Sequence, residues 1–353
     1  MASSSAGTPS VLWGEEFLPK FMKYSPVTEE EKTAGENGKA AVADDSGDVT
    51  ESEGETDYDS CEDDTEEEPE EESIEDMIAR LQRSENNENL KVHDSLENHW
   101  TSPPGRLFSL RAKGYFAQEG GFTTNNLGYK QPSLSCAYET IGMAVFEGGA
   151  KLVPAIDKVA ELKEFLAKMN GVDEAPGDAP QFLVTCFSFN NFFRTSFLTV
   201  VHIFKRVVPI DSKGDGHLDR TMTRFLESDD ETKRQKFKFV PKFRHGSQSL
   251  RKAINMLGGE RPVIIGMRLR TDFTVRDKVI EIDMDVGSSK VATMLYGLVR
   301  KTSGGLIVDY SFLIEGQKED ELPERLLGSI RWHHCTAEAC AVPIDAEGNI
   351  VSK

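Results

Sequence analysis

Three carboxylates stand at alternate positions of one apolar segment and are the residues best placed to do chemistry. Glu281, Asp283 and Asp285 alternate with apolar residues between positions 280 and 286, so a strand would place all three on one face. Successive side chains on one face of a strand lie about 6.6–7 Å apart. One divalent cation could therefore bridge two of these carboxylates, but not all three.

A second interpretation of these carboxylates needs no ligand. Arg268 and Arg270 alternate with apolar residues in the preceding segment. If the two segments form a hairpin with matched polar faces, Arg270 lies opposite Glu281 and Arg268 lies opposite Asp283. Cross-strand pairs of opposite charge stabilise a sheet by about 0.2–1 kcal/mol. We favour this charge ladder, and the sequence accordingly predicts no metal site and no cofactor.

Gly287, Ser288 and Ser289 lead into a predicted helix and form a candidate anion site. The free amides at a helix N-terminus can hold an anion or a phosphate. An ordinary N-cap by Ser288 or Ser289 is the simpler interpretation. Because the segment has no Walker lysine and no dinucleotide fingerprint, its motif does not indicate a nucleotide site.

A basic segment at residues 233–245, KRQKFKFVPKFRH, contains no acid. Its candidate anionic-lipid-binding residues are Lys233, Arg234, Lys236, Lys238, Lys242 and Arg244. A strand would place Lys236 and Lys238 on one face and two phenylalanines on the other. The simpler interpretation puts the phenylalanines in the core and the lysines in solvent. The functional interpretation is a strip that meets anionic lipid headgroups, where each cation contributes about 1 kcal/mol.

The remaining motifs favour no catalytic or metal-binding role. Residues 211–216 resemble the start of an EF-hand loop, but Lys213 and Met222 stand where ligands are required, which predicts a polar turn. Cys186 lies in an apolar strand and is interpreted as a buried thiol. Nothing indicates a Ser-His-Asp or Cys-His arrangement. Four nominal zinc ligands lack a second pair at the right spacing: His333, His334, Cys335 and Cys340.

From Trp100 onward the apolar periodicity changes between that of strands and that of helices. Strands are predicted at residues 108–115, 137–146, 181–189, 196–208, 236–243, 263–271, 279–286 and 306–315. Helices are predicted at residues 153–169, 218–227, 249–257 and 289–301. This order predicts an α+β domain with a largely antiparallel sheet packed with several helices.

Residues 1–96 are predicted to form a disordered acidic arm, because they are poor in aliphatic residues and rich in Glu, Asp, Ser and Gly. Two short helical islands interrupt the arm, at residues 11–22 and 73–81. Residues 44–76 hold 19 of the 60 acids and no Lys or Arg. The other 41 acids equal the 41 lysines and arginines, so the rest of the chain is formally neutral. The sequence therefore predicts no nucleic-acid partner.

Five hydroxyl residues of the arm have an acid three positions later, a pattern that acidophilic kinases recognise. They are Thr50, Ser52, Thr56, Ser60 and Thr65. Phosphorylation there would deepen the negative charge. The composition of such an acidic tract gives the same matches without any role.

Cysteine usage and hydropathy bear on the compartment. Five scattered cysteines make no disulfide framework in a chain of 353 residues, which favours a reducing compartment. The N-terminus has no signal-peptide pattern, and the longest apolar stretch, residues 197–210, is too short and too polar to span a bilayer. We expect a cytoplasmic protein without a transmembrane segment, whose membrane contact, if any, is peripheral.

Several short motifs follow one another between residues 98 and 333. They are Trp100 with Pro103; Phe108, Arg111 and Tyr115; KFKFVP at 236–241; EID at 281–283; DVGSS at 285–289; IEGQ at 314–317; and ELPE at 321–324. In this order they resemble the C-terminal domain of the plant Enhanced Disease Resistance 2 family, a module that is also found alone in algae and other protists. The chain departs from the family pattern at residues 190–194 and at 244–249, where a Gly-Pro-Trp element is usual.

The resemblance brings no catalytic residues with it, and it implies no established activity for the module itself. In longer family members this domain follows a lipid-binding pleckstrin-homology domain and a START domain. We expect the arm at residues 1–96, the domain at 97–335 and a C-terminal tail at 336–353. The first hypothesis is a non-enzymatic module for lipid or membrane surfaces, regulated by the acidic arm. The alternatives are an interaction scaffold whose arm binds basic partners, and an enzyme of unrecognised type.

Overall fold

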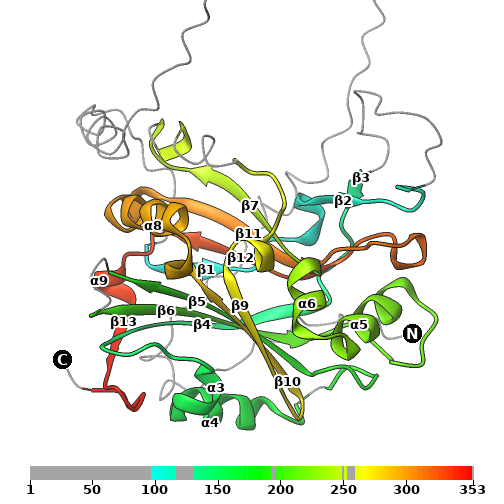
Figure 1. Cartoon of the computed structure of the whole chain (residues 1–353), viewed down its shortest axis with the longest axis horizontal. Helices are drawn as coiled ribbons and strands as arrows, with labels where there is room; N and C mark the ends of the chain where they lie inside the picture. The colour runs from blue at the N-terminus through cyan, green and yellow to red at the C-terminus, as the bar shows by residue number, and fades with distance from the viewer. Residues whose placement is uncertain are drawn as a thin grey trace, which may run out of the picture. The chain divides into compact units, whose positions relative to one another are not determined.

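A computed structural model provides the structure of the chain (Figure 1). It describes residues 97–116, 130–172, 174–191, 195–248, 250–252 and 259–351. The predicted arm, its helical islands and its five candidate phosphorylation sites lie outside the described residues. So does most of the predicted helix at residues 249–257.

Two sheets form the centre of the domain (Figure 1). The five-stranded sheet is antiparallel throughout and has the order β1 (His99–Thr101), β12 (Leu326–His333), β11 (Ile307–Ile314), β7 (Phe237–His245), β8 (Val263–Ile264). The six-stranded sheet has the order β13 (Ala341–Ile344), β4 (Tyr138–Gly148), β6 (Phe197–Arg206), β5 (Phe182–Asn190), β10 (Val279–Asp285), β9 (Arg270–Arg276). Only the β13–β4 and β5–β10 pairs of these described strands are parallel. The largely antiparallel α+β fold predicted from the sequence is confirmed.

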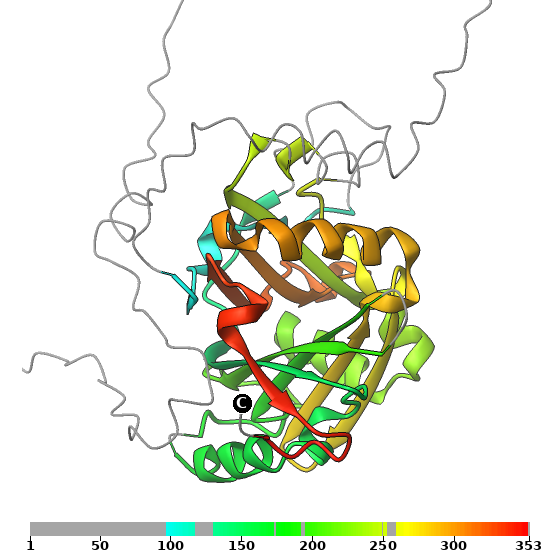
Figure 2. The same cartoon turned by 90° about the vertical axis from the view of Figure 1, so that its left-hand side faces the viewer.

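The main core lies between the facing sides of the two sheets. On β5, Leu183 points into this core, whereas its neighbours Phe182 and Val184 point to the opposite side of the sheet. That alternation follows from the two-residue period of a strand. Helices α3 (Ala155–Lys158) and α4 (Ala160–Met169) cover the opposite side (Figures 1 and 2). The six-stranded sheet is therefore buried on both faces, which explains its near-continuous apolar sequence.

The other described helices border the main core. They are α5 (His217–Glu227), α6 (Asp230–Lys236), α8 (Lys290–Thr302) and α9 (Ala337–Cys340), together with the 3-10 turns η2 (Gly105–Leu107), η4 (Ile265–Met267), η5 (Val286–Ser288), η6 (Ser303–Gly305) and η7 (Glu319–Glu321). A small sheet of β2 (Ser109–Arg111) and β3 (Lys130–Pro132) lies apart from the two large sheets. None of the described helices is both long and apolar enough to cross a membrane.

Several element bounds differ from the predicted ones. The predicted helix at 153–169 is divided by Val159, which has extended backbone angles. The predicted strand at 263–271 ends after two residues, because η4 interrupts it before β9 begins. Strand β13 pairs with β4 at the edge of the six-stranded sheet (Figure 2), so the predicted tail at 336–353 contains a strand of the fold.

A glycine of β12 tests how closely the two large sheets pack, and a glycine of α8 serves as its control. A Cβ atom on Gly328 of β12 would lie 2.5 Å from the ring of Phe204 on β6, across the main core. We expect Gly328→Ala to lower the free energy of unfolding by about 1–3 kcal/mol, because the ring must move within a packed core. Gly297 in α8 is the control, since nothing lies within 4 Å of a Cβ atom there. Gly297→Ala should stabilise by about 0.5–1 kcal/mol. Urea unfolding measures both, and equal effects would contradict the packing described.

Candidate functional site

A network of buried and half-buried charges brings together residues of four family-like motifs, those at 108–115, 236–241, 314–317 and 321–324. Arg111 comes from β2, Lys238 from β7, and Glu315 follows β11. Glu321 ends η7, and Glu324 precedes β12. Segments separated by as many as 213 positions in the chain are joined here. Together with Lys236 and Arg224, these residues are called the charge network.

Lys238 is the centre of one half of the charge network. Its Nζ lies 2.8 Å from Glu324 Oε1 and 3.0 Å from Glu315 Oε1. Arg111 Nη2 lies 2.8 Å from the same carboxylate oxygen of Glu315. The Glu324 carboxylate also accepts hydrogen bonds from the backbone N–H groups of Arg111 and Gly316. Every buried charge in this half therefore has an opposite charge or a hydrogen-bond donor beside it.

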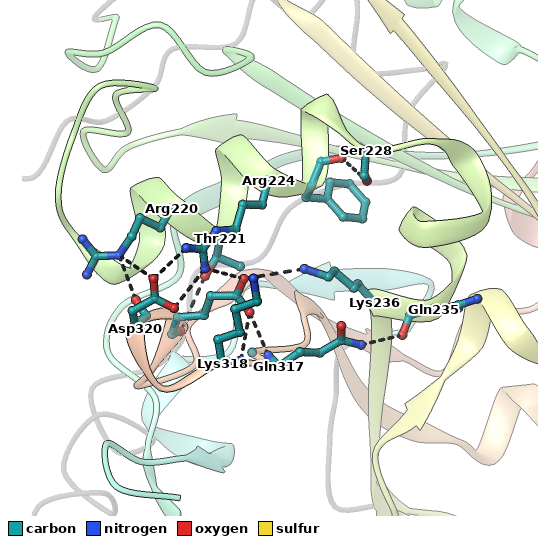
Figure 3. A network of polar contacts seen from close by, with 12 residues as sticks. Arg220, Thr221, Arg224, Ser228, Gln235, Lys236, Gln317, Lys318 and Asp320 are labelled. Carbon is teal, nitrogen blue, oxygen red and sulfur yellow. Dashed lines mark hydrogen bonds and ion pairs between the residues drawn. The ribbon is translucent and has the colours of Figure 1, made fainter. Parts of the chain in front are cut away.

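Glu321 is the centre of the other half, which Figure 3 shows. Its carboxylate accepts from Arg224 Nη1 at 2.9 Å and from the backbone N–H of Gln317 at 2.8 Å. Lys236 Nζ lies 3.6 Å away, and in Figure 3 its side chain points to the same place as Arg224. Arg224 Nη2 also donates to Asp320 at 2.6 Å.

These contacts set the ionisation of Glu321. Burial by itself raises the pKa of this carboxyl group, but the hydrogen bonds from Arg224 and Gln317 and the charge of Lys236 outweigh it. The pKa of Glu321 is therefore below its ordinary value. Beside it, a hollow of about 10 Å³ between α5 and the β11–β12 connection has room for roughly one water molecule. The ion pairs and hydrogen bonds of the charge network join β2, β7, α5 and the β11–β12 connection.

The predicted lysine strip is not exposed. Lys233, Lys236 and Lys238 are all buried, with at most 8% of each residue accessible. The prediction that Lys236 and Lys238 face solvent is therefore wrong. Lys236 is the last residue of helix α6 and does not belong to the strand. Lys238 is covered because acids some eighty positions later in the chain fold over it.

The other cations of the predicted strip also have partners within the chain. Arg234 donates to the carbonyl oxygen of Thr271 at 2.8 Å. Lys242 donates to the carbonyl oxygen of Leu107, and Arg244 lies 2.6 Å from Asp309. Lys233 donates to the carbonyl oxygen of Ser228. These residues do not form the continuous basic surface that binding to lipid headgroups through this segment would require.

The charge ladder predicted for β9 and β10 is also wrong. In the observed register Arg270 lies opposite Asp285, and Asp283 lies opposite Asp272. Arg268 precedes β9 because η4 interrupts the predicted strand. The expected cross-strand partners therefore do not meet. On the other side of β10, the residue beside Asp283 in the register is Cys186 of β5.

Glu281 and Asp283 are buried side by side on the face of β10 that α3 covers, and they differ in their partners. Glu281 accepts from the backbone N–H groups of Ala155 at 2.5 Å and Ile156 at 2.9 Å, at the start of α3. Both carboxylate oxygens of Asp283 are buried without a hydrogen-bond partner. Burial, and then the neighbouring charge of Glu281, raise the pKa of Asp283 to about 9. Burial also raises the pKa of the Cys186 thiol, as a buried thiol predicts.

The turn before α8 is a helix cap. Ser289 Oγ accepts from the backbone N–H of Ala292 at 3.3 Å. Ser288 Oγ accepts from the backbone N–H of Arg270 and donates to the carbonyl oxygen of Asp285. The N-cap interpretation is confirmed, and the anion interpretation of residues 287–289 stays a prediction.

The other motifs have structural roles. Asp219 accepts from the backbone N–H groups of Asp211 and Gly216, which confirms the polar turn. His333 hydrogen-bonds Thr101, and His334 Nδ1 lies 3.0 Å from the carbonyl oxygen of Gly304. The Cys335 thiol hydrogen-bonds the carbonyl oxygens of His99 and His333. The Cys340 thiol hydrogen-bonds Asn98 Oδ1.

Sequence reasoning missed a buried polar chain in the main core. His202 of β6 lies with Nδ1 3.1 Å from Thr185 Oγ1 and with Nε2 2.5 Å from the Tyr310 hydroxyl. Burial lowers the pKa of His202 to about 3, so the ring is neutral at physiological pH. Only the position of a histidine in an otherwise apolar strand could have indicated it. The chain links the two sheets, because Tyr310 belongs to β11.

Exposed cations and apolar side chains flank, along the chain, the two segments that a hydrogen bond joins at the start of β9 and before α8. We call Met267, Arg268, Arg270, Lys290 and Val291 the basic edge. Met267 is 56% exposed and Val291 is 52% exposed. The hydrogen bond from the backbone N–H of Arg270 to Ser288 joins the two segments. Arg268 and Lys290 make no ion pair with any described residue.

Removal of the Lys238 ammonium group tests how much the charge network contributes to the free energy of unfolding. We expect Lys238→Met to lower the free energy of unfolding by about 3–5 kcal/mol, because Glu315 and Glu324 then keep buried charge with less compensation. Lys163→Met, at an exposed position of α4, is the control and should change it by less than about 0.5 kcal/mol. Urea unfolding measures both. A loss below about 1 kcal/mol for Lys238→Met would contradict the role.

The lowered pKa of Glu321 predicts an acid-side loss of stability. A carboxyl group with a lower pKa in the folded state stabilises the fold above its ordinary pKa, near 4.3, and loses this effect as the pH falls. We expect Arg224→Gln to reduce the free energy of unfolding at neutral pH and to flatten its decline on acidification. Unfolding curves recorded at several pH values measure this. Parallel curves for the two proteins would contradict it.

Comparison with known proteins assigns the family. The family model described as "Protein ENHANCED DISEASE RESISTANCE 2, C-terminal" matches residues 100–335. "Protein ENHANCED DISEASE RESISTANCE 2-like" from Arabidopsis thaliana is 33% identical over 120 residues, which cover 34% of this chain and 16% of that protein. The match thus spans less than a fifth of the relative's length. No solved structure matches. Because the family model covers most of the chain and includes every segment of the charge network, the chain belongs to the Enhanced Disease Resistance 2 C-terminal family.

Proposed function

We propose that this domain is a non-enzymatic module that binds anionic membrane surfaces through the basic edge, with the acidic arm as its regulator. Family membership supports a non-catalytic domain. The observation that carries the proposal is the exposure of Met267 and Val291, together with three exposed cations, in the segments where β9 and α8 begin. The basic edge replaces the lysine strip, whose members are buried or paired.

The composition of the basic edge suits the membrane interface. Cations near an anionic leaflet contribute about 1 kcal/mol each, and exposed apolar side chains gain by entering the boundary between headgroups and acyl chains. Arg270 keeps 70% of its side chain exposed although Asp272 lies 3.5 Å away. Since β9 is an edge strand, its outer side is not covered by another described strand of the sheet. Cations on an edge strand also discourage pairing with other chains, which is the structural alternative.

The acidic arm supplies an intramolecular competitor for the basic edge. Its 19 acids between residues 44 and 76 have the charge that the basic edge attracts. Phosphorylation at Thr50, Ser52, Thr56, Ser60 or Thr65 would strengthen the competition. We propose a cytoplasmic protein that associates peripherally with membranes when the arm is displaced.

The second candidate function follows from the same acids. An arm of this charge density can bind a basic protein partner, with the folded domain as a scaffold. Under this alternative the basic edge has no role. The two functions therefore differ in whether the domain's cations or the arm's acids are required for binding.

Flotation of full-length protein with vesicles tests the proposed function. Vesicles of phosphatidylcholine alone, with phosphatidylserine and with a phosphoinositide are compared at two salt concentrations. A second full-length protein has the acids of residues 44–76 replaced by Ser, Asn or Gln. We expect binding to anionic vesicles only, weaker at high salt and stronger in the protein with the neutral arm. Absence of flotation in both proteins would overturn the proposal and favour the scaffold.

Charge-neutralising variants locate the membrane-binding surface. Replacing Arg268, Arg270 and Lys290 together by Gln should weaken partition onto anionic vesicles at least tenfold, because each cation contributes about 1 kcal/mol. The matched control replaces three lysines of α3 and α4 by Gln and should change partition less than twofold: Lys158, Lys163 and Lys168. Equal losses in both variants would show a general charge effect and would contradict binding through the basic edge.

A further inference from the structure

We propose that Cys186, Glu281 and Asp283 bind one thiophilic divalent cation, for which Zn²⁺ is the best fit. The site lies on the side of the six-stranded sheet that α3 and α4 cover. It is separate from the basic edge and does not depend on the proposed membrane function. The three residues come from adjacent parallel strands, with Asp283 directly beside Cys186 in the register.

The distances between the side chains suit a small cation. One thiol sulfur and one oxygen from each carboxylate all lie within 4.8 Å of one another. Zn²⁺ binds sulfur at about 2.3 Å and carboxylate oxygen at about 2.0 Å, so tetrahedral ligands of these two kinds lie about 3.5 Å apart. The Sγ atom of Cys186 lies 3.4 Å from Glu281 Oε1. Two of the three ligands therefore already have the separation that a zinc site requires.

The unpartnered carboxylate of Asp283 is the independent observation that indicates a ligand. The residue is only 2% exposed, and neither side-chain oxygen makes a hydrogen bond of ordinary geometry, although Glu281 and Cys186 lie beside it. Buried polar side chains are nearly always satisfied, and an unsatisfied one costs about 1–3 kcal/mol, more when it is charged. The nearest ammonium group does not resolve this, because Lys151 pairs with Asp285 at 3.0 Å. A cation between Asp283, Glu281 and Cys186 would supply the missing partner.

The surroundings of Glu281 resemble the support that a metal ligand needs. The backbone N–H groups of Ala155 and Ile156 hold its two carboxylate oxygens in one orientation. Hydrogen bonds to ligating carboxylates fix ligand geometry in metal sites in this way. Oε2 keeps a second lone pair for a cation, and that of Oε1, which accepts from the Cys186 thiol, becomes free when the thiol loses its proton to bind the metal.

The donor atoms favour Zn²⁺ over the common hard cations. Mg²⁺ and Ca²⁺ take oxygen ligands, and six or more of them, whereas a thiolate selects softer ions. One thiolate with two carboxylates carries a formal charge of −3, which exceeds the +2 charge of a divalent ion by one. A bound ion would join β5 to β10 and, through Glu281, to α3. We therefore infer a metal site with three protein ligands, which leaves a fourth position open.

Cobalt binding to full-length protein tests the site, because a thiolate bound to Co²⁺ gives an intense near-ultraviolet charge-transfer band. The protein carries Cys61→Ser throughout, since Cys61 lies among the acids of the arm and could bind cobalt itself. After chelator treatment and gel filtration, Co²⁺ is added to one equivalent and then Zn²⁺. We expect a charge-transfer band that saturates at one Co²⁺ per chain and disappears on addition of Zn²⁺. Cobalt binding without the band would overturn the proposal.

Substitutions then assign the ligands. Asp283→Asn keeps the shape of the side chain and should weaken cobalt binding at least tenfold, and Cys186→Ala should abolish the band. Cys136→Ser is the matched control, because Cys136 hydrogen-bonds Ser329 away from the site, and its band should be unchanged. Near-ultraviolet circular dichroism reports whether each variant is folded. A band that persists in folded Cys186→Ala protein would overturn the assignment.

X-ray absorption at the zinc edge decides the matter if the variants unfold. It is recorded on Cys61→Ser protein loaded with one equivalent of Zn²⁺. We expect one sulfur neighbour at about 2.3 Å with oxygen neighbours near 2.0 Å. A shell of oxygen and nitrogen alone, or two or more sulfur neighbours, would overturn the site.

Discussion

The pairing of Lys238 with Glu324 and Glu315 is the interaction on which the rest of the fold depends. It joins strand β7 to the connection between β11 and β12, and Arg111 ties β2 to the same carboxylates. Desolvation makes a buried pair unfavourable unless hydrogen bonds satisfy its remaining atoms. Here backbone N–H groups of Arg111 and Gly316 do so for Glu324. The network therefore specifies which strands meet, because any other pairing leaves these charges without partners.

The two buried acids of β10 are less completely paired than the acids of the charge network. Glu281 has backbone donors at the start of α3, whereas Asp283 has no hydrogen-bond partner. Asp309, a buried acid of the other sheet, contacts both Arg244 and Arg331. Because the fold satisfies Asp309 and the acids of the charge network so fully, the unpartnered Asp283 is not explained by a general tolerance of buried charge. A ligand or a bound proton has to account for it.

Much of the fold could be predicted from periodicity, and most of the site could not. The two-residue alternation around Glu281 gave β10 nearly to the residue, and the helix at 289–301 begins one residue later than predicted. The burial of Lys238 could not be predicted, because its partners lie some eighty positions away and their position depends on the topology. The hairpin register was also out of reach. It follows from the two-residue turn at Asp277 and Lys278, which pairs Arg276 with Val279 and extends β9 past the predicted end of the strand.

The neighbour of Asp283 explains why the candidate cation site was missed. Spacing along β10 alone separates its carboxylates by the strand repeat and makes a metal site unfavourable. The parallel pairing with β5 brings in Cys186 from 95 positions earlier than Glu281 and replaces the distant third carboxylate with a thiol. The same strand pairs with β9, which carries Arg270 of the basic edge. A cation that holds β10 against β5 and α3 would therefore also hold β9 in place. The position of Arg270 in the proposed membrane-binding surface depends on that strand.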